Sequence, residues 1–207
     1  MYRPPAFAED DPEVLAALIA AHPLGLLITH GPDGVMAGPL PFQLTDGVLR
    51  AHLARANPQI AQIAAQPDVL VVFQAGDAYV HPGWYPSKAD HGRVVPTWNY
   101  AMVQVRGRAR LDDSADFLMP QITALTEAQE QGRPDPWAVS DAPSPFIAAQ
   151  MRGIIGLEIG ITQMQGKLKL SQNRSPADRA GVRAGLMAEG DPLARLMPDP
   201  AASTPDA

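Results

Sequence analysis

The segment LGLLITHGPDGVMAGPLPFQLTDGVLRAHL, residues 24–53, decides the fold class. It holds three apolar runs, residues 24–30, 35–44 and 48–53, which are separated by Gly31-Pro-Asp-Gly34 and Thr45-Asp-Gly47. Gly, Pro and Asp between apolar runs favour tight turns, and a tight turn joins two strands in antiparallel pairing. The segment therefore predicts a three-stranded antiparallel meander.

On both sides of this meander, proline marks the starts of helices. A capping side chain comes before proline in Asp11-Pro12, Asn57-Pro58, Ser144-Pro145, Ser175-Pro176 and Asp191-Pro192. The cap accepts a free backbone N–H, and proline at the first helical position loses no hydrogen bond. We therefore expect helices over residues 12–21, 58–65, 145–151, 176–188 and 192–197, with another over 114–131.

The remaining apolar runs predict further strands, over residues 69–73, 94–111, 154–161 and 167–170, with residues 77–81 extended. A hairpin turn at Gln163-Met-Gln-Gly166 is expected between the last two, and residues 82–93 and 132–143 are expected to be loops. Strands at this spacing with peripheral helices indicate a mainly antiparallel α+β barrel. One domain is expected over residues 1–197, followed by a flexible tail over 198–207.

Bulk composition narrows the function classes. The chain has 207 residues, of which 46% are hydrophobic, and its net charge is −6, which argues against a broad nucleic-acid surface. It has no cysteine, which excludes disulfides and thiolate chemistry. We find no membrane-spanning stretch, signal peptide, dinucleotide-binding glycine motif or metal-ligand spacing, and we expect a cytoplasmic protein. The basic residues near the C-terminus are interpreted as a solvated helix face: Lys167, Lys169, Arg174, Arg179 and Arg183.

Polar and aromatic side chains gather in three segments, residues 84–88, 95–100 and 167–174. Two of the three Trp and two of the four Tyr lie within residues 84–100. Flat rings beside polar side chains can stack on a planar ligand and bind its phosphate. Strand alternation places Thr97 and Asn99 on one face and Trp98 and Tyr100 on the other. The face of Thr97 and Asn99 is therefore either wet or binds a polar group.

The segment His52-Leu-Ala-Arg55-Ala-Asn57-Pro58 joins a predicted strand to a predicted helix. Backbone N–H groups at a helix start attract phosphate, and Arg55 could clamp a phosphate in a bidentate manner. The alternative is that Asn57 is a plain N-cap and Arg55 a surface residue. The segment alone favours this alternative.

Several of these segments together resemble the PaiB family. These are bacterial proteins with the FMN-binding split β-barrel, often called negative transcriptional regulators. The resemblance runs in order from Met1 to about Met197. It rests on residues 1–4, 23–25, 52–58, 84–88, 95–100, 136–137, 141–143 and 169–173.

The resemblance implies a six-stranded split β-barrel that forms a homodimer with FMN at the subunit interface. It places one group of cofactor-binding residues on the strand-to-helix turn and another on a mobile loop, the following strand and the late segment. The first group is His52, Arg55 and Asn57. The second is Lys88, Thr97, Trp98, Asn99, Lys169, Gln172 and Asn173.

Three functions stay open. The first is an FMN-binding protein, either a flavin-dependent oxidoreductase or a flavin-linked regulator; no side chain has an evident acid–base or nucleophilic role, so the chemistry would be that of the flavin. The second is a negative transcriptional regulator acting directly or through a partner, although the net charge argues against direct DNA binding. The third is a haem-binding or haem-degrading split barrel that uses one of the five histidines.

Overall fold

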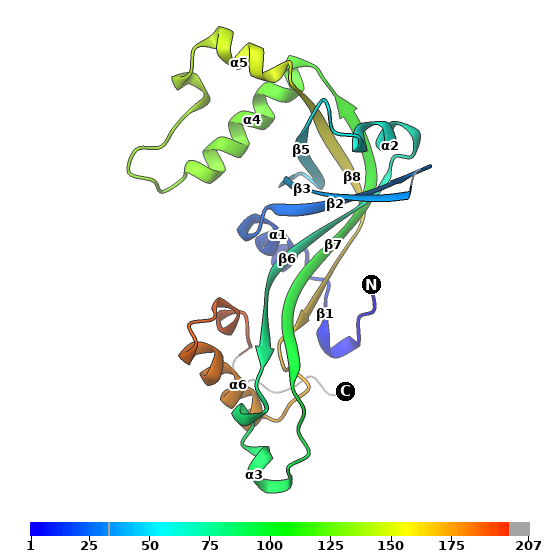
Figure 1. Cartoon of the computed structure of the whole chain (residues 1–207). Helices are drawn as coiled ribbons and strands as arrows, with labels where there is room; N and C mark the ends of the chain where they lie inside the picture. Colours follow the sequence, from blue (N-terminus) through cyan, green and yellow to red (C-terminus); the bar gives the residue numbers. More distant parts are fainter. Residues whose placement is uncertain (33, 199–207) are drawn as a thin grey trace. The chain divides into compact units, whose positions relative to one another are not determined.

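The computed structural model of the chain describes residues 1–32 and 34–198, in an α+β fold with an antiparallel sheet. Two compact units are present. Unit 1 contains Met1–Leu18, Gln74–Gln104 and the chain from Gln165 onward, and unit 2 contains Ile19–Phe73 and Val105–Met164. Three long strands contribute residues to both units (Figure 1): β6 (Asp68–Val80), β7 (Thr97–Asp112) and β8 (Ile154–Lys169).

Two expectations about domains stay predictions. A single domain over residues 1–197 stays a prediction beside the division into two units. The predicted tail over 198–207 lies, apart from Pro198, outside the described residues. Within the part of the chain that the structure describes, no helix is both long and apolar enough to cross a membrane.

The predicted meander forms in unit 2. Strands β2 (Leu24–Gly31) and β3 (Gly34–Pro41) pair as an antiparallel hairpin. Strands β4 (Gln43–Thr45) and β5 (Val48–Ala54) pair in the same way. Between them Asp46 and Gly47 have φ values of 50° and 78°, the positive pair that a two-residue type I′ turn requires. Both predicted hairpins are confirmed, but the predicted middle strand over residues 35–44 is divided at Phe42 into β3 and β4.

This interruption explains how the sheet curves. The strand order is β3-β2-β6-β7-β8-β5-β4, so β3 and β4 stand at opposite ends of the path. Only Phe42 separates them in the chain. Because consecutive Cα atoms are about 3.8 Å apart, the two edges must meet, and the sheet of unit 2 must curl round on itself. Phe42 is buried at the meeting point, with its ring edge-on to Phe73 at 5.7 Å.

The expected number of strands is wrong, because the sheet formed by the described residues has eight strands rather than six. Six of them contain seven residues or more. The other two are β4 and the two-residue β1 (Ala8–Glu9), which pairs with β8 in unit 1. A bridge of two residues carries no hydrophobic alternation, so the sequence pattern does not mark it.

Most predicted helices form close to their expected bounds. Two of the expected caps are confirmed, because Asp11 accepts from the Glu13 N–H at 2.8 Å and Ser175 accepts from the Asp178 N–H at 3.2 Å. The expected cap at Ser144 is wrong, because α5 begins at Ser144 and its N-cap, Pro143, has no side-chain cap hydrogen bond. The short helix over Ser87–His91 differs from the expectation, which is a loop over residues 82–93. The helices are α1 (Pro12–Ala21), α2 (Gln59–Ala65), α3 (Ser87–His91), α4 (Ala115–Glu130), α5 (Ser144–Met151) and α6 (Pro176–Ala188), with short 3-10 turns η1 (Pro5–Phe7), η2 (Pro82–Trp84), η3 (Val139–Asp141) and η4 (Pro192–Arg195).

The predicted hairpin turn at residues 163–166 is wrong, because β8 runs without interruption from Ile154 to Lys169. Gly166 is required there for packing rather than for a turn. A Cβ at this position would lie 2.4 Å from Leu15 of α1 and 3.1 Å from Glu9 of β1, so only glycine lets the three segments approach.

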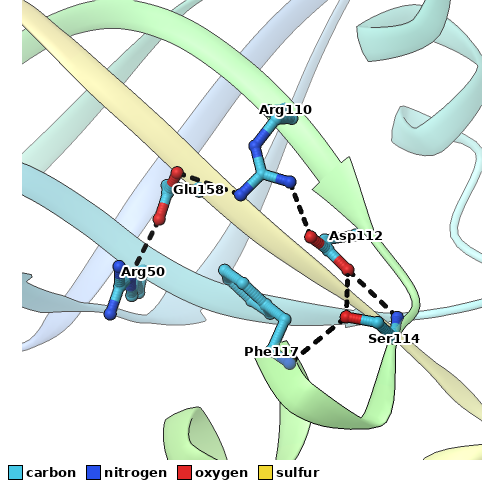
Figure 2. Close-up of polar contacts among 6 residues, drawn as sticks. All are labelled: Arg50, Arg110, Asp112, Ser114, Phe117 and Glu158. Atoms are coloured by element: carbon cyan, nitrogen blue, oxygen red, sulfur yellow. Dashed lines mark hydrogen bonds and ion pairs between the residues drawn. The ribbon is translucent and has the colours of Figure 1, made fainter.

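A charged network ties β5, β7 and β8 of unit 2 together (Figure 2). Glu158 of β8 accepts from Arg50 of β5 at 3.0 Å and from Arg110 of β7 at 3.1 Å. Arg110 also pairs with Asp112 at 2.6 Å. Burial alone would raise the pKa of Glu158, but the hydrogen bonds from Arg110 and Arg50 outweigh it and lower that pKa. We call Arg50, Arg110, Asp112 and Glu158 the charged network.

The network continues into the start of α4. Asp112 accepts from the Ser114 hydroxyl at 2.6 Å and from the Ser114 N–H at 3.0 Å. Hydrogen bonds from Ser114 and Arg110 lower the pKa of Asp112 to about 2. Ser114 in turn caps α4 by accepting from the Phe117 N–H at 3.2 Å. The guanidinium carbons of Arg50 and Arg110 each lie 5.8 Å from the centre of the Phe117 ring. Figure 2 draws the three side chains.

Candidate functional site

A group of three cations, Lys167, Lys169 and Arg174, gathers in unit 1 where β8 ends, and we call it the basic cluster. Lys167 and Lys169 are two residues apart on one strand and therefore share a face. The Lys169 ammonium donates to the Thr97 hydroxyl at 2.7 Å and to the Trp98 carbonyl. The ammonium of Lys167, which is almost fully buried, lies 5.3 Å from the Tyr2 ring and 5.4 Å from the Tyr100 ring.

The charge of the basic cluster is not balanced by acidic side chains. Among the described residues, no carboxylate forms an ion pair with Lys167, Lys169 or Arg174. Arg174 instead lies 4.9 Å above the buried Tyr85 ring. Burial, with the nearby charges of Lys167 and Arg174, lowers the pKa of Lys169. An anion bound here would offset both effects.

The interpretation of the late basic residues as a solvated helix face is wrong. Arg179 of α6 is 2% exposed, and Arg174 and Arg183 are half-buried. The reason is the close approach of α6 to the segment around Trp84. A Cβ at Gly185 would lie 2.3 Å from the Trp84 ring, and one at Gly181 would lie 2.0 Å from the Trp84 carbonyl. Glycine at both positions lets α6 pack inward with its arginines.

An exposed aromatic pair adjoins the basic cluster. The side chains of Trp98 and Tyr79 are 54% and 46% exposed, and their rings meet edge to face at 6.1 Å. Trp98 is also the residue whose carbonyl holds Lys169. Exposed aromatic rings offer a flat apolar surface on which a planar molecule can stack.

The face of Thr97 and Asn99 is occupied by the turn that follows β8. Asn99 is fully buried and donates to the Ser171 hydroxyl at 2.9 Å. Ser171 has a φ of 66°, a conformation that costs energy for a residue with a side chain. Gln172 accepts from the Leu170 N–H at 2.7 Å and donates to the Leu168 carbonyl. Asn99 and Gln172 therefore hold the turn that positions the basic cluster.

The structure thus brings together five of the predicted cofactor-binding residues. Thr97, Trp98, Asn99, Lys169 and Gln172 are linked to the basic cluster or to its turn. Lys88 on α3 and Asn173 are exposed members of the same unit. Sequence reasoning missed Ser171, Tyr79 and Lys167 as members of the site. The run of four polar residues after Leu170 was the signal that could have found Ser171.

The other predicted residues, His52, Arg55 and Asn57, lie in unit 2. His52 donates through Nδ1 to Gln121 of α4 at 2.8 Å, and Asn57 accepts from the Gln59 N–H at 2.9 Å at the start of α2. The capping alternative for Asn57 describes this contact. Arg55 donates to the Arg152 carbonyl at 2.9 Å. The assignment of all ten residues to one cofactor stays a prediction.

Comparison with known proteins places the chain in a family. Residues 1–163 match the family model described as "Putative FMN-binding domain". An uncharacterized protein of Emericella nidulans is 35% identical over 90% of both chains. The protease synthase and sporulation protein PAI 2 of Bacillus subtilis is 31% identical over 95% of this chain and 94% of its own.

A solved structure shows the same fold at low identity. It is the FAD and heme binding protein from Mycobacterium smegmatis, with a TM-score of 0.60 and 17% identity over 78% of this chain and 73% of that one. The match of the family model and the Bacillus relative both agree with the motifs that resemble PaiB. The chain therefore belongs to the PaiB family of FMN-binding domains.

Proposed function

We propose that this chain binds FMN and that the basic cluster holds an anionic part of the cofactor. The observation that carries the proposal is the set of three cations without an ion-pair partner among the described residues, one of which, Lys169, donates to the backbone carbonyl of the exposed Trp98. A planar, phosphorylated molecule fits this combination, because a ring needs a flat apolar surface and a phosphate needs fixed cations.

Lys169 is the residue best placed to contact the anion. An ammonium has three N–H donors, and two of them are used by the Thr97 hydroxyl and the Trp98 carbonyl. The third is free for a ligand, while the first two fix the direction of the side chain. Lys167, held between two tyrosine rings, adds charge without changing its place. Asn99 and Gln172 keep the turn rigid.

The proposal extends to the reaction class and the assembly. When bound, a flavin supplies one-electron and two-electron transfer, so we propose a flavin-dependent oxidoreductase in the cytoplasm. A homodimer with the flavin at its interface, to which His52, Arg55 and Asn57 contribute, rests on the family resemblance alone. A regulatory role that uses the same flavin site is a second candidate, favoured by the name of the Bacillus relative, a sporulation protein.

Titration of the purified chain with FMN and with riboflavin tests the proposal. Because riboflavin lacks the phosphate, we expect it to bind about 10- to 100-fold more weakly than FMN, as followed by quenching of flavin fluorescence. Equal affinity for FMN and riboflavin would show that the basic cluster does not bind the phosphate. If neither flavin binds at micromolar protein concentration, the proposal is wrong. Sedimentation of the FMN-loaded chain tests the homodimer.

The oxidoreductase role has a separate test. Stopped-flow reduction of the bound flavin by NADH and NADPH is compared with that of free FMN at the same concentration. Faster reduction of the bound flavin by either donor supports the oxidoreductase role. If both donors reduce bound flavin no faster than free flavin, the regulatory candidate is favoured.

A further inference from the structure

We propose that unit 2 contains a second binding site, for an amphipathic monoanion with a carboxylate head and an unbranched apolar body. The site is a cavity of about 600 Å³ lined by α4, η3, α5 and the segment after β5. Figure 1 shows α4 and α5 joined by the long connection that carries η3. Sites for small molecules have volumes of roughly 300–1,000 Å³, so the cavity suits one such ligand.

The walls of the cavity determine the body of the ligand. Leu118 and Met119 of α4, Val139 of η3, and Ile147 and Met151 of α5 supply apolar surface. Met119 is 39% exposed, so this surface is accessible from outside. Two methionines adapt their shape to a flexible chain more readily than branched residues do. An unbranched hydrocarbon is the body that such a wall accommodates.

One end of the cavity is cationic. Arg55 is held in place because it donates from Nε to the Arg152 carbonyl at 2.9 Å. Its terminal nitrogens reach Asp113 only at 3.4 Å, longer than the roughly 2.7–2.9 Å of a strong charged pair. Arg152 donates to the Ala148 carbonyl at 3.3 Å and has no ion-pair partner among the described residues. Two guanidinium groups against one carboxylate leave this end positive.

The opposite end is acidic, which orients the ligand. Glu127 lines the cavity, and it lies twelve residues along α4 from Ala115, which lies two residues after Asp113. At about 1.5 Å per residue the two ends are about 18 Å apart. A carboxylate is therefore attracted to the arginine end and repelled from the Glu127 end. The distance also limits the chain to roughly a medium-length fatty acid.

This cavity is distinct from the basic cluster, to which the proposed function assigns the anionic part of the flavin. None of the residues of the basic cluster lines the cavity, and all of its lining residues belong to unit 2. Arg55 appears in the cavity and also in the predicted cofactor set, so it is unsuitable for a test. Arg152 and Ala148 line the cavity, are exposed, and have no place in the predicted flavin site.

The ligand class is tested with the full chain, both free and FMN-loaded. The probe is anilinonaphthalene sulfonate, an apolar monoanion that fluoresces when bound, and the competitors are hexanoate, octanoate, decanoate, decanol and decylamine. We expect affinity to rise about fourfold for each added methylene of the carboxylates. Decanol and decylamine should compete at least about tenfold less well than decanoate. Equal competition by decanol, or displacement of the probe by FMN, would overturn the proposal.

Two variants locate the site. Arg152→Gln should weaken decanoate binding about tenfold while the matched control Arg108→Gln, an exposed arginine outside the cavity, leaves it unchanged. Ala148→Phe should fill the cavity and remove probe binding. Flavin binding should be unaffected by Arg152→Gln and Arg108→Gln, neither of which is in the predicted cofactor set, so failure here is distinguishable from failure of the flavin proposal. If Ala148→Phe instead changes the oligomeric state and leaves decanoate binding intact, the surface joins two chains and the proposal is wrong.

Discussion

The charged network of unit 2 and the basic cluster of unit 1 both gather long cationic side chains against β8, but they balance the charge differently. In the network, Arg50 and Arg110 face Glu158 and Asp112, and each cation has a carboxylate within 3.1 Å (Figure 2). In the basic cluster the cations meet aromatic rings, a hydroxyl and a backbone carbonyl.

This difference separates a structural role from a binding role. One of the two acids of the network, Asp112, has a pKa lowered to about 2, so the fold favours its charged form. The base of the cluster, Lys169, also has a lowered pKa, but for a lysine this means that the fold disfavours its charged form. The network is stabilised by its own charges, whereas we propose that the cluster is completed by an anion from outside.

Replacing one cation in each group should give the largest difference between the two groups, measured as the loss of FMN affinity. Lys169→Met should reduce FMN affinity by about 10- to 100-fold, because a charged hydrogen bond to the cofactor is lost. Arg110→Met makes the same chemical change in the network and should leave FMN affinity within about twofold of the wild type, below the value of one weak hydrogen bond. Fluorescence titration measures both. Similar losses in the two variants would show that the groups do not differ in role.

The free energy of unfolding should change in the opposite way to FMN affinity: replacing a residue of the charged network should lower it more than replacing a residue of the basic cluster. Glu158→Gln leaves Arg50 and Arg110 without a shared partner and should cost about 1–2 kcal/mol of unfolding free energy, between the values for exposed and buried pairs. Lys169→Met should cost nothing or stabilise the ligand-free chain, because it removes a cation from a like-charged group. Urea unfolding of the two variants measures the change in the free energy of unfolding. A larger loss in Lys169→Met than in Glu158→Gln would contradict the comparison.

Inorganic anions should stabilise unit 1 by occupying the basic cluster. Pyrophosphate at a concentration several times its dissociation constant should contribute about 1 kcal/mol, which corresponds to about 2–4 °C in the thermal midpoint of a chain of this size. Sodium chloride at equal ionic strength is the control for screening. The double variant Lys167→Met/Lys169→Met should lose the pyrophosphate effect, and persistence of the effect there would place the anion elsewhere.

Local signals explain the parts of the fold that could be predicted from the sequence. The type I′ turn at Asp46 and Gly47 and the caps at Asp11 and Ser175 depend on a few neighbouring residues, and all of them form. The break at Phe42 was not predicted. It depends on the closure of the sheet, which brings together strands that are far apart in the sequence.

Tertiary packing explains the parts that could not be predicted. Gly166 resembles a turn residue in the sequence, yet it lies within β8, where its lack of a side chain leaves room for Leu15. Arg179 lies in a charged segment, yet α6 buries it because Gly181 and Gly185 admit the chain around Trp84. Thr97 and Lys169, both candidates from the sequence, are joined by a hydrogen bond, and their role in cofactor binding stays a prediction. The run of four polar residues after Leu170 marks Ser171 in the sequence, but its contact with Asn99, 72 residues away, depends on the tertiary fold.

The charged network and the basic cluster should also differ in how they make the free energy of unfolding depend on pH, and this is the smallest expected difference between them. The pKa of Asp112 in the folded chain, about 2, is below its unfolded value of about 3.9. Its contribution is therefore complete above that value and is lost as the pH falls toward about 2. The lowered pKa of Lys169 acts at the other end of the scale, because stability rises as the pH passes from its folded value toward about 10.4.

Two variants assign these changes to their groups. Asp112→Asn should flatten the acid limb of a plot of the urea midpoint against pH and leave the alkaline limb unchanged, while Lys169→Met should do the reverse. Saturating pyrophosphate should also suppress the alkaline rise, because an anion beside Lys169 restores its preference for the charged form. If pyrophosphate changes the acid limb instead, the anion binds at the charged network, and the distinction between a closed and an open group of charges fails.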